Sequence, residues 1–122
     1  MKEKKDNPVR DKSLAFAIRV VRLYQFLSGE KKEYVISKQL LRSGTSIGAN
    51  VKEATQAESK PDFIHKMAIA LKEASETEYW LEILKETGYL EKKAFDSIQN
   101  DCDELVGLLT TIIKTAKRNP KS

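Results

Sequence analysis

Hydrophobic residues recur at helical spacing along most of the chain, and this pattern predicts four helices. The expected helices cover residues 13–28, 33–57, 60–87 and 92–117, with short breaks between them. Short connections place consecutive helices side by side and antiparallel. The sequence therefore predicts an all-α fold, an antiparallel up-down-up-down four-helix bundle.

The last two predicted helices each carry a continuous row of core positions. In the fourth helix, apolar residues alternate at spacings of three and four, which is typical of the seam of a bundle. This seam consists of Phe95, Ile98, Cys102, Leu105, Leu109, Ile112 and Ala116. The expected core row of the third helix consists of Ile64, Met67, Leu71, Ala74, Glu78 and Leu81. Ser59 is the predicted N-cap of the third helix, because Pro61 and Asp62 follow it in the first turn.

The chain carries more apolar residues than one bundle core requires. The first predicted helix has one apolar row of Phe16, Val20, Leu23 and Leu27 and a second of Leu14, Ile18 and Val21. Further apolar residues outside the core rows are Ile69, Trp80, Ile83, Val106, Leu108 and Ile113. Hydrophobic residues scattered singly over a surface are also common on monomers. We favour a homo-oligomer, in which these residues pack against neighbouring copies.

The second predicted helix combines small and polar residues in an unusual way. Gly44 and Gly48 share a row with Leu41, and each glycine costs a helix about 1 kcal/mol relative to alanine. Close helix packing at Gly44 and Gly48 is the expected compensation. A neighbouring polar row consists of Gln39, Ser43, Ser46, Asn50 and Glu53. Buried polar groups must be paired, so we expect a structural polar network with Glu76 as a candidate partner. Contact of this row with a ligand or nucleic acid is the alternative.

Length and composition favour one domain. The chain has 122 residues, which suits a single bundle domain over residues 13–117, flanked by flexible tails over 1–12 and 118–122. No apolar run approaches the ~20 residues that cross a bilayer, and the N-terminal segment lacks a signal-peptide core. We therefore expect a cytoplasmic protein without a membrane partner. The single cysteine, Cys102, lies in an apolar row and is expected to be a buried, unreactive thiol.

The net charge of +4 is unevenly distributed. Residues 13–71 hold nine basic and five acidic side chains, whereas residues 72–104 hold four basic and ten acidic ones. Within the basic half, the candidate nucleic-acid-binding residues are Arg19, Arg22, Lys38, Arg42 and Lys52. They could follow a phosphate backbone if the first two helices are neighbours. A solvated basic face is the alternative, and Tyr34 is the sole aromatic residue that the sequence places near this row.

The sequence shows no clear pattern of catalytic residues or metal ligands. A di-iron bundle needs two Glu-x-x-His motifs, whereas this chain has a single histidine, His65, three residues after Asp62. The closely spaced acidic residues of the third helix are Glu73, Glu76, Glu78 and Glu82, and a charged helix face explains them better than paired catalytic carboxylates. We expect no catalytic residue, no metal site and no cofactor.

A segment of the second predicted helix resembles the signature of the 23S rRNA intervening-sequence protein family, also called four helix bundle proteins. It reads LRSGTSIGANVKEA from Leu41 to Ala54. The positions that match the family pattern are Arg42, Ser46, Ile47, Asn50 and Glu53. The likeness continues through Ala70, Glu76 and Leu81 to Gly88 and Tyr89, and covers nearly everything from Leu14 to Ile113. The chain departs from the pattern at Ala54, where Gly is usual, and at Lys72 and Glu73, where many members have Gly and Ser.

The resemblance implies an antiparallel four-helix bundle in a prokaryotic setting, assembled into a ring with a homopentamer as the expected form. A similar bundle is the accessory protein of diversity-generating retroelements, a basic pentamer that works with a reverse transcriptase and nucleic acid. We therefore predict a non-enzymatic homo-oligomer that binds RNA or other nucleic acid through basic surfaces. The alternative is a protein–protein scaffold or adaptor that does not bind nucleic acid.

Overall fold

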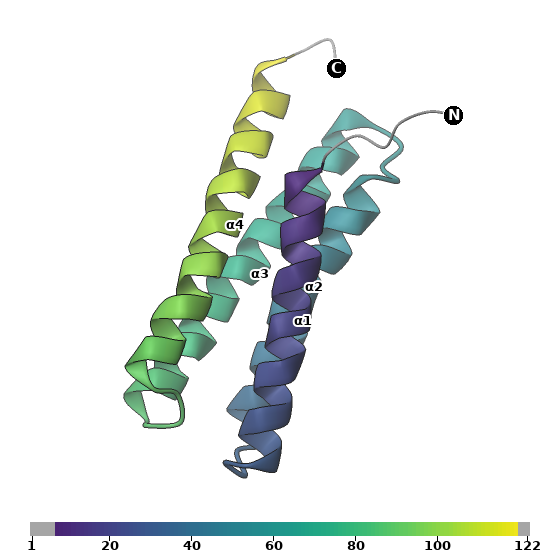
Figure 1. The fold of residues 1–122 in the computed structure, drawn as a ribbon. Coiled ribbons are helices and arrows are strands. Elements are labelled where there is room, and N and C mark those ends of the chain that lie inside the picture. Colours follow the sequence, from purple (N-terminus) through teal and green to yellow (C-terminus); the bar gives the residue numbers. More distant parts are fainter. Residues whose placement is uncertain (1–6, 120–122) are drawn as a thin grey trace, which may run out of the picture.

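The computed structural model describes residues 7–119 and consists of four long helices (Figure 1). They are α1 (Pro8–Gly29), α2 (Ile36–Ala54), α3 (Lys60–Glu86) and α4 (Lys92–Arg118). The described residues contain no β-strand. The predicted all-α four-helix bundle is therefore confirmed.

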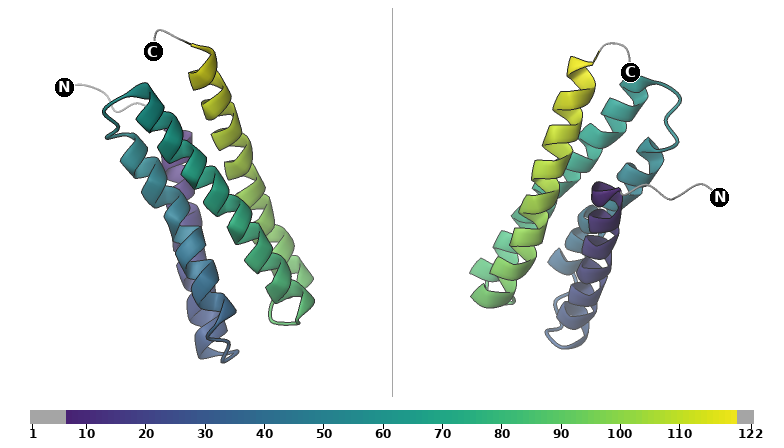
Figure 2. Two further views of the ribbon diagram at one scale, coloured as in Figure 1. Left: turned by 180° about the vertical axis from the view of Figure 1, so that it is seen from behind. Right: turned by 45° about the horizontal axis from the view of Figure 1, so that its top comes forward.

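Consecutive helices run antiparallel. The start of α1, the α2–α3 connection and the end of α4 lie at one end of the bundle, and the other two connections lie at the opposite end (Figures 1 and 2). Helix α1 packs on α2, α2 on α3 and α3 on α4, while α1 and α4 contact each other least. Among the described residues, neither diagonal pair of helices comes into close contact. The bundle therefore has four sides, one for each pair of neighbouring helices, and its α1–α4 side is the most loosely packed.

The core lies along the axis of the bundle and contains side chains from all four helices. Its largest fully buried hydrophobic side chains are Val20, Leu27, Leu40, Ile47, Val51, Leu81, Leu84, Cys102, Leu105 and Leu109. The predicted seam of α4 is confirmed, because Ile98, Cys102, Leu105 and Leu109 are buried and Phe95 and Ile112 pack half-buried against them. Burial of apolar side chains in this continuous core is the main stabilising contribution to the fold.

The predicted core row of α3 is correct only in part. Met67, Ala74 and Leu81 are buried as expected, but Ile64 and Glu78 are half-exposed. A second row is buried instead, and it consists of Ala70, Thr77 and Leu84. The reason is that α3 packs against both α2 and α4, so its buried arc is wider than a single row.

The first helix begins earlier than predicted. Residues 8–12, expected in the N-terminal tail, form the first turn of α1. Asn7 caps this turn, since its Oδ1 accepts a hydrogen bond from the backbone N–H of Arg10 (3.2 Å), and Pro8 occupies the first helical position. At the other end, Arg118 still belongs to α4. The remaining tail residues, 1–6 and 120–122, lie outside the described residues.

A buried carboxylate in the α1–α2 connection caps the start of α2, which begins three residues later than predicted, at Ile36. Glu33 Oε2 accepts hydrogen bonds from the backbone N–H groups of Val35 (3.2 Å) and Ile36 (2.9 Å), and its Oε1 accepts one from Ser37 (2.6 Å). Burial raises the pKa of Glu33, but these hydrogen bonds outweigh it and hold the pKa below its usual value. Ser59 is the N-cap of α3, as predicted, and accepts from the N–H of Asp62 (3.2 Å).

Candidate nucleic-acid interface

Arg42, a predicted nucleic-acid contact on α2, is held by acidic side chains of α3. Its guanidinium donates to Glu73 Oε1 (3.3 Å) and makes a short hydrogen bond to Glu76 Oε2. The indole N–H of Trp80 donates to the same Glu76 oxygen (3.0 Å). The hydrogen bond to Glu76 raises the pKa of Arg42, and the hydrogen bonds from Trp80 and Arg42 lower the pKa of Glu76. Arg42 therefore joins α2 to α3 as a charged cross-link.

Arg19, a second predicted contact, is held by α4. Its Nη1 lies 2.6 Å from Asp101 Oδ2, and its Nη2 donates to Ser97 Oγ at 2.6 Å. Lys12 makes a parallel link from α1 to α4, with its Nζ 3.0 Å from Glu104 Oε2. Arg19 and Lys12 thus link α1 to α4 across the loosest side of the bundle, where helix-to-helix contact is sparse.

The other three predicted contacts, Arg22, Lys38 and Lys52, are exposed to solvent. Among the residues that the structure describes, none of the three forms an ion pair. The five predicted residues do not form one row, because Arg19 turns toward α4 and Arg42 toward α3. Their role in nucleic-acid binding stays a prediction, and the three unpaired cations are the ones available to phosphates.

The polar residues of the family-like segment make mostly local bonds. Ser46 Oγ donates to the carbonyl of Arg42 (2.6 Å), and Asn50 Nδ2 donates to the carbonyl of Ser46 (2.8 Å), so both satisfy α2 itself. Glu53 forms an ion pair with Lys66 of α3 (2.9 Å), which raises the pKa of Lys66. The structure therefore brings Glu76 to Arg42 and not to Ser46, Asn50 or Glu53.

The buried polar contact between α2 and α3 involves a residue that the sequence reasoning missed. Thr77 Oγ1 lies 2.9 Å from Ser43 Oγ, and both side chains are fully buried. Thr77 also bonds the carbonyl of Glu73 (2.8 Å), which satisfies its hydroxyl within its own helix. The available signal was the position of Thr77, seven residues after Ala70 and four before Leu81 on a core row.

The two glycines of α2 lie where α1 comes closest. An added β-carbon at Gly44 would lie 2.8 Å from both methyl carbons of Val20, and one at Gly48 would lie 3.3 Å from the carbonyl oxygen of Ser13. Beside Gly48 the surface of α1 and α2 is hollowed to a volume of about 650 Å³. This hollow is lined by Asn7, Arg10, Ser13, Leu14, Ala17, Thr45, Gly48, Ala49, Lys52 and Thr55.

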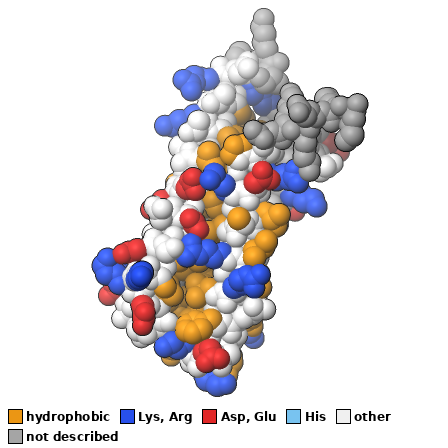
Figure 3. Space-filling view, viewed as in Figure 1, with side chains coloured by type: hydrophobic (Ala, Val, Ile, Leu, Met, Phe, Trp, Pro, Cys, Tyr) orange, Lys and Arg blue, Asp and Glu red, His pale blue; other side chains and the backbone are white. Residues whose placement is uncertain are grey.

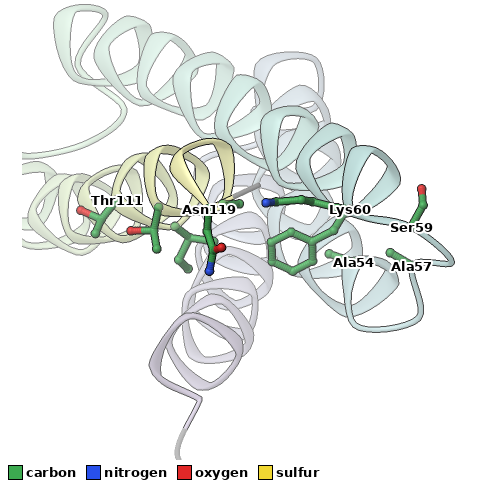
Figure 4. A pocket seen from close by; sticks show the side chains of 10 residues that line it. Ala54, Ala57, Ser59, Lys60, Thr111 and Asn119 are labelled. Atoms are coloured by element: carbon green, nitrogen blue, oxygen red, sulfur yellow. The ribbon is translucent and has the colours of Figure 1, made fainter. Parts of the chain in front are cut away.

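A separate apolar pocket of about 540 Å³ lies at the end of the bundle, between the α2–α3 connection and the last turns of α4 (Figure 4). Its walls are mostly apolar and include Ala54, Phe63 and Ile112. Lys60 extends from the first turn of α3 toward the end of α4, where Asn119 lies (Figure 4). The pocket offers apolar surface with one ammonium group at its edge.

Carboxylates of α3 and α4 meet around the single thiol. Gln99 Nε2 bridges Glu78 Oε2 (2.8 Å) and Asp103 Oδ1 (3.0 Å). Burial raises the pKa of Glu78, and Asp103 raises it further. Burial together with the nearby carboxylates raises the pKa of Cys102 to about 12, and its Sγ lies 3.5 Å from the carbonyl of Ala74. A thiol in this setting is a packing element and not a nucleophile.

Over residues 7–119, no group of three or more His, Cys, Asp or Glu side chains is placed to hold a metal ion. Over the same range, no helix is long and apolar enough to cross a membrane. The predicted cytoplasmic location and the absence of a cofactor stay predictions.

Comparison with known proteins assigns the chain to a family. The model of the family described as 23S rRNA-intervening sequence protein matches residues 5–111. The chain belongs to this family. The resemblance noted in the sequence is thereby confirmed.

A solved structure from Bacteroides thetaiotaomicron, described as a protein of unknown function from the S23 ribosomal protein family, is 61% identical to this family member. Its TM-score is 0.86, and the match covers 87% of this chain and 98% of the other. No curated protein matches the chain.

In this family member, the family-like segment lies on α2, one of the two helices that pack closely against two neighbours. Helix α2 packs against both α1 and α3. Gly44 meets α1, while Ser43 and Arg42 each bond α3. Within this segment Arg42, Ser43 and Gly44 therefore serve contacts between helices, and the family assignment by itself identifies no reactive site.

Proposed function

We propose that this protein is a non-enzymatic, self-associating bundle that binds RNA or other nucleic acid through unpaired basic residues. An exposed apolar row on α1, made of Leu14, Ile18 and Val21, is the observation that carries self-association. Their side chains are 58%, 47% and 36% exposed although they follow one another along a single helix face. The row borders the hollow at Gly48 and Ala49, where backbone is accessible to a neighbouring helix.

This row contributes part of the free energy that a subunit contact needs. Full burial of one Leu, Ile or Val side chain is worth about 1.5–3 kcal/mol. These three side chains are already partly buried, so covering what remains exposed adds about 2–4 kcal/mol in all. Association costs about 4–15 kcal/mol in lost subunit freedom, so the row supplies only part of what a contact requires. A ring repeats the contact between each pair of neighbours, and a homopentamer is the form that the family resemblance implies.

The mass of the protein in solution tests this contact. We expect light scattering after size-exclusion chromatography to give a multiple of the 13.9 kDa chain mass for the wild type and the chain mass alone for Ile18→Lys. The matched control is Val35→Lys, which places the same charge on a side chain that is 71% exposed but lies outside the row. A wild type that is monomeric at micromolar concentration would remove self-association from the proposal.

Nucleic-acid binding is supported by the unpaired cations Arg22, Lys38 and Lys52 and by the basic residues near both ends of the chain. Each phosphate contact releases counterions, so the logarithm of affinity falls with the logarithm of salt by roughly one unit per contact. We expect Lys38→Ala and Lys52→Ala each to lower this slope by about one, without changing the preference among sequences. An affinity that changes neither with salt concentration nor with either substitution would contradict the proposal.

A scaffold without nucleic-acid binding is the second candidate, and the ion pairs of Arg19 and Arg42 favour it. Two of the five predicted nucleic-acid contacts already have acidic partners. The stretch from Glu73 to Glu104 also leaves an acidic surplus on the α3–α4 half, which suits a basic protein partner. Co-purification from native cells with and without nuclease separates the candidates, because only an RNA-bound complex releases its cargo after nuclease treatment.

A further inference from the structure

The α1–α4 side of the bundle, where contact between helices is sparsest, carries a hollow. This α1–α4 hollow has a volume of about 250 Å³ and is lined by Arg19, Arg22, Leu23, Leu90, Ala94 and Ile98. Figure 3 shows hydrophobic side chains gathered between α1 and α4, with Lys and Arg side chains beside them. The hollow is therefore an apolar surface with a cationic edge.

An exposed aromatic ring continues this surface toward the end of the bundle. Phe26 follows Arg19 by seven residues and Leu23 by three, so it lies on the same face of α1 one turn further along. Its side chain is 44% exposed, which is unusual for a phenylalanine next to a core. The ammonium group of Lys31 lies over the ring, 5.9 Å from its centre.

Two basic side chains near the Phe26 ring form no ion pair with a described residue. Within the described part of the chain, neither Arg22 nor Lys31 has an acidic partner, whereas Arg19 is neutralised by Asp101. Single-stranded nucleic acid binds to surfaces of this kind, where bases stack on aromatic rings and cations contact the phosphates. The exposed Tyr34 and Tyr89 lie in the two connections at the same end of the bundle (Figure 1).

We propose that the surface formed by the α1–α4 hollow and the adjoining Phe26 ring binds an unpaired nucleotide of a single-stranded nucleic acid, with its base stacked on Phe26 and its phosphate held by Arg22 and Lys31. This inference rests on the nucleic-acid part of the proposed function and adds a site and a strand type. The apolar rows of α1 leave Phe26 outside the predicted core, but the sequence alone does not show that it adjoins a hollow shared with α4.

The charges favour a nucleotide over an apolar face of a second copy of the chain. An apolar face of another subunit would bury Arg22 and Lys31 without counter-charges, which is costly. A phosphate supplies the missing negative charge. The apolar row of Leu14, Ile18 and Val21 does not line this hollow, so self-association through that row leaves the hollow free. Duplex bases are stacked inside their helix and cannot reach the ring, which predicts a preference for single strands.

Fluorescence anisotropy with a labelled single-stranded oligouridylate, compared with an RNA duplex of equal length, tests the site. One stacked base is worth about 5- to 150-fold in affinity by alanine substitution, so we expect Phe26→Ala to weaken single-strand binding by about fivefold or more. Phe26→Leu keeps apolar volume without a π-face and should lose nearly as much, while Phe26→Trp should retain binding. Tyr79→Ala, which removes a 60% exposed ring from α3, is the matched control.

Two charge variants complete the test. Arg22→Ala should lower the salt slope of single-strand binding by about one. Glu30→Gln removes the acidic group one helical turn after Phe26 and should tighten binding. Photocrosslinking of the wild type with 5-iodouridine in the oligonucleotide should label the peptide that contains Phe26.

The outcomes separate the site from the wider proposal. If the wild type binds neither probe, this inference fails together with nucleic-acid binding. Suppose instead that the wild type binds and Lys38→Ala lowers its salt slope. If Phe26→Ala or Phe26→Leu then binds single strands with wild-type affinity, the site fails and the proposed function stands. A lower mass for Phe26→Ala in light scattering would assign the hollow to a subunit contact and overturn the inference.

Discussion

Replacing Gly44 with alanine measures how closely α1 and α2 pack. The new β-carbon would lie 2.8 Å from both methyl carbons of Val20, a side chain that is fully buried. Valine is stiff at χ1, so it cannot turn its methyl groups away and the two helices must separate. Overpacking of this kind costs about 1–3 kcal/mol, while alanine gains about 1 kcal/mol in helix propensity over glycine. We expect a net effect between neutral and about 2 kcal/mol of destabilisation.

Gly107→Ala is the matched control, because it makes the same chemical change in the interior of α4 with no atom within 4 Å of the new β-carbon. It should stabilise the protein by about 1 kcal/mol through propensity alone. The difference between the two alanine variants in the free energy of unfolding is then the steric cost at Gly44. Urea unfolding followed by circular dichroism measures it, at one fixed protein concentration because association shifts apparent stability.

A double-mutant cycle with Val20→Ala identifies the clash. Val20→Ala alone should cost about 2 kcal/mol, from the lost methyl groups and the cavity they leave. In the double variant the methyl group of residue 44 enters that cavity. The loss in the free energy of unfolding should therefore be smaller than the sum of the two single-variant losses by about 1–3 kcal/mol. Equal stabilisation by Gly44→Ala and Gly107→Ala, or strict additivity in the cycle, would refute the close contact.

Two further predictions concern buried ionisable groups. Glu33→Gln removes the charge that the first N–H groups of α2 bind, and should lower the free energy of unfolding by about 1–2 kcal/mol at neutral pH. Because the pKa of Glu33 is lowered by folding, this difference should be complete above the unfolded pKa of about 4.3 and shrink as pH falls through the folded pKa. A loss that grows on acidification would contradict the cap. The thiol of Cys102, with its pKa raised to about 12, should resist iodoacetamide until the protein is unfolded, and labelling of the native protein at the unfolded rate would contradict its burial.

The fold could be predicted because hydrophobic spacing determines the number of helices and most of their buried faces, although it missed the row of Ala70, Thr77 and Leu84 on α3. The alternating positions from Ile98 to Leu109 allow one buried side of α4, and that side faces the core. Helix ends depend on smaller signals. Asn7 and Pro8 carry the usual capping pattern at the start of α1, but the apolar rows of this helix begin several residues later. The cap at Glu33 could not be predicted from the sequence, because its carboxylate meets the N–H groups of α2 only after the α1–α2 connection folds back on the helix.

The candidate site was harder to predict because it depends on distances between helices. Arg42 lies opposite the apolar row of its own helix, which predicts a solvated side chain, yet it reaches Glu73 and Glu76 on α3. Long side chains can follow a helix surface to a neighbour, and helical periodicity says nothing of that reach. Phe26 is the converse case, since its exposure follows from the sparse contact between α1 and α4 and not from its own sequence context.

The ion pairs change what the net charge of +4 means for function. The basic α1–α2 half and the acidic α3–α4 half face each other within one chain, and Arg19, Arg42 and Lys12 each end on a carboxylate of the opposite half. Charges paired in this way steer a distant phosphate weakly, because each cation is accompanied by an anion a few ångströms away. The surface available to nucleic acid is set by the cations left over, which in the described structure include Arg22 and Lys31 beside the α1–α4 hollow. A nucleic-acid-binding role therefore depends on where unpaired charge meets an accessible ring, and not on total charge.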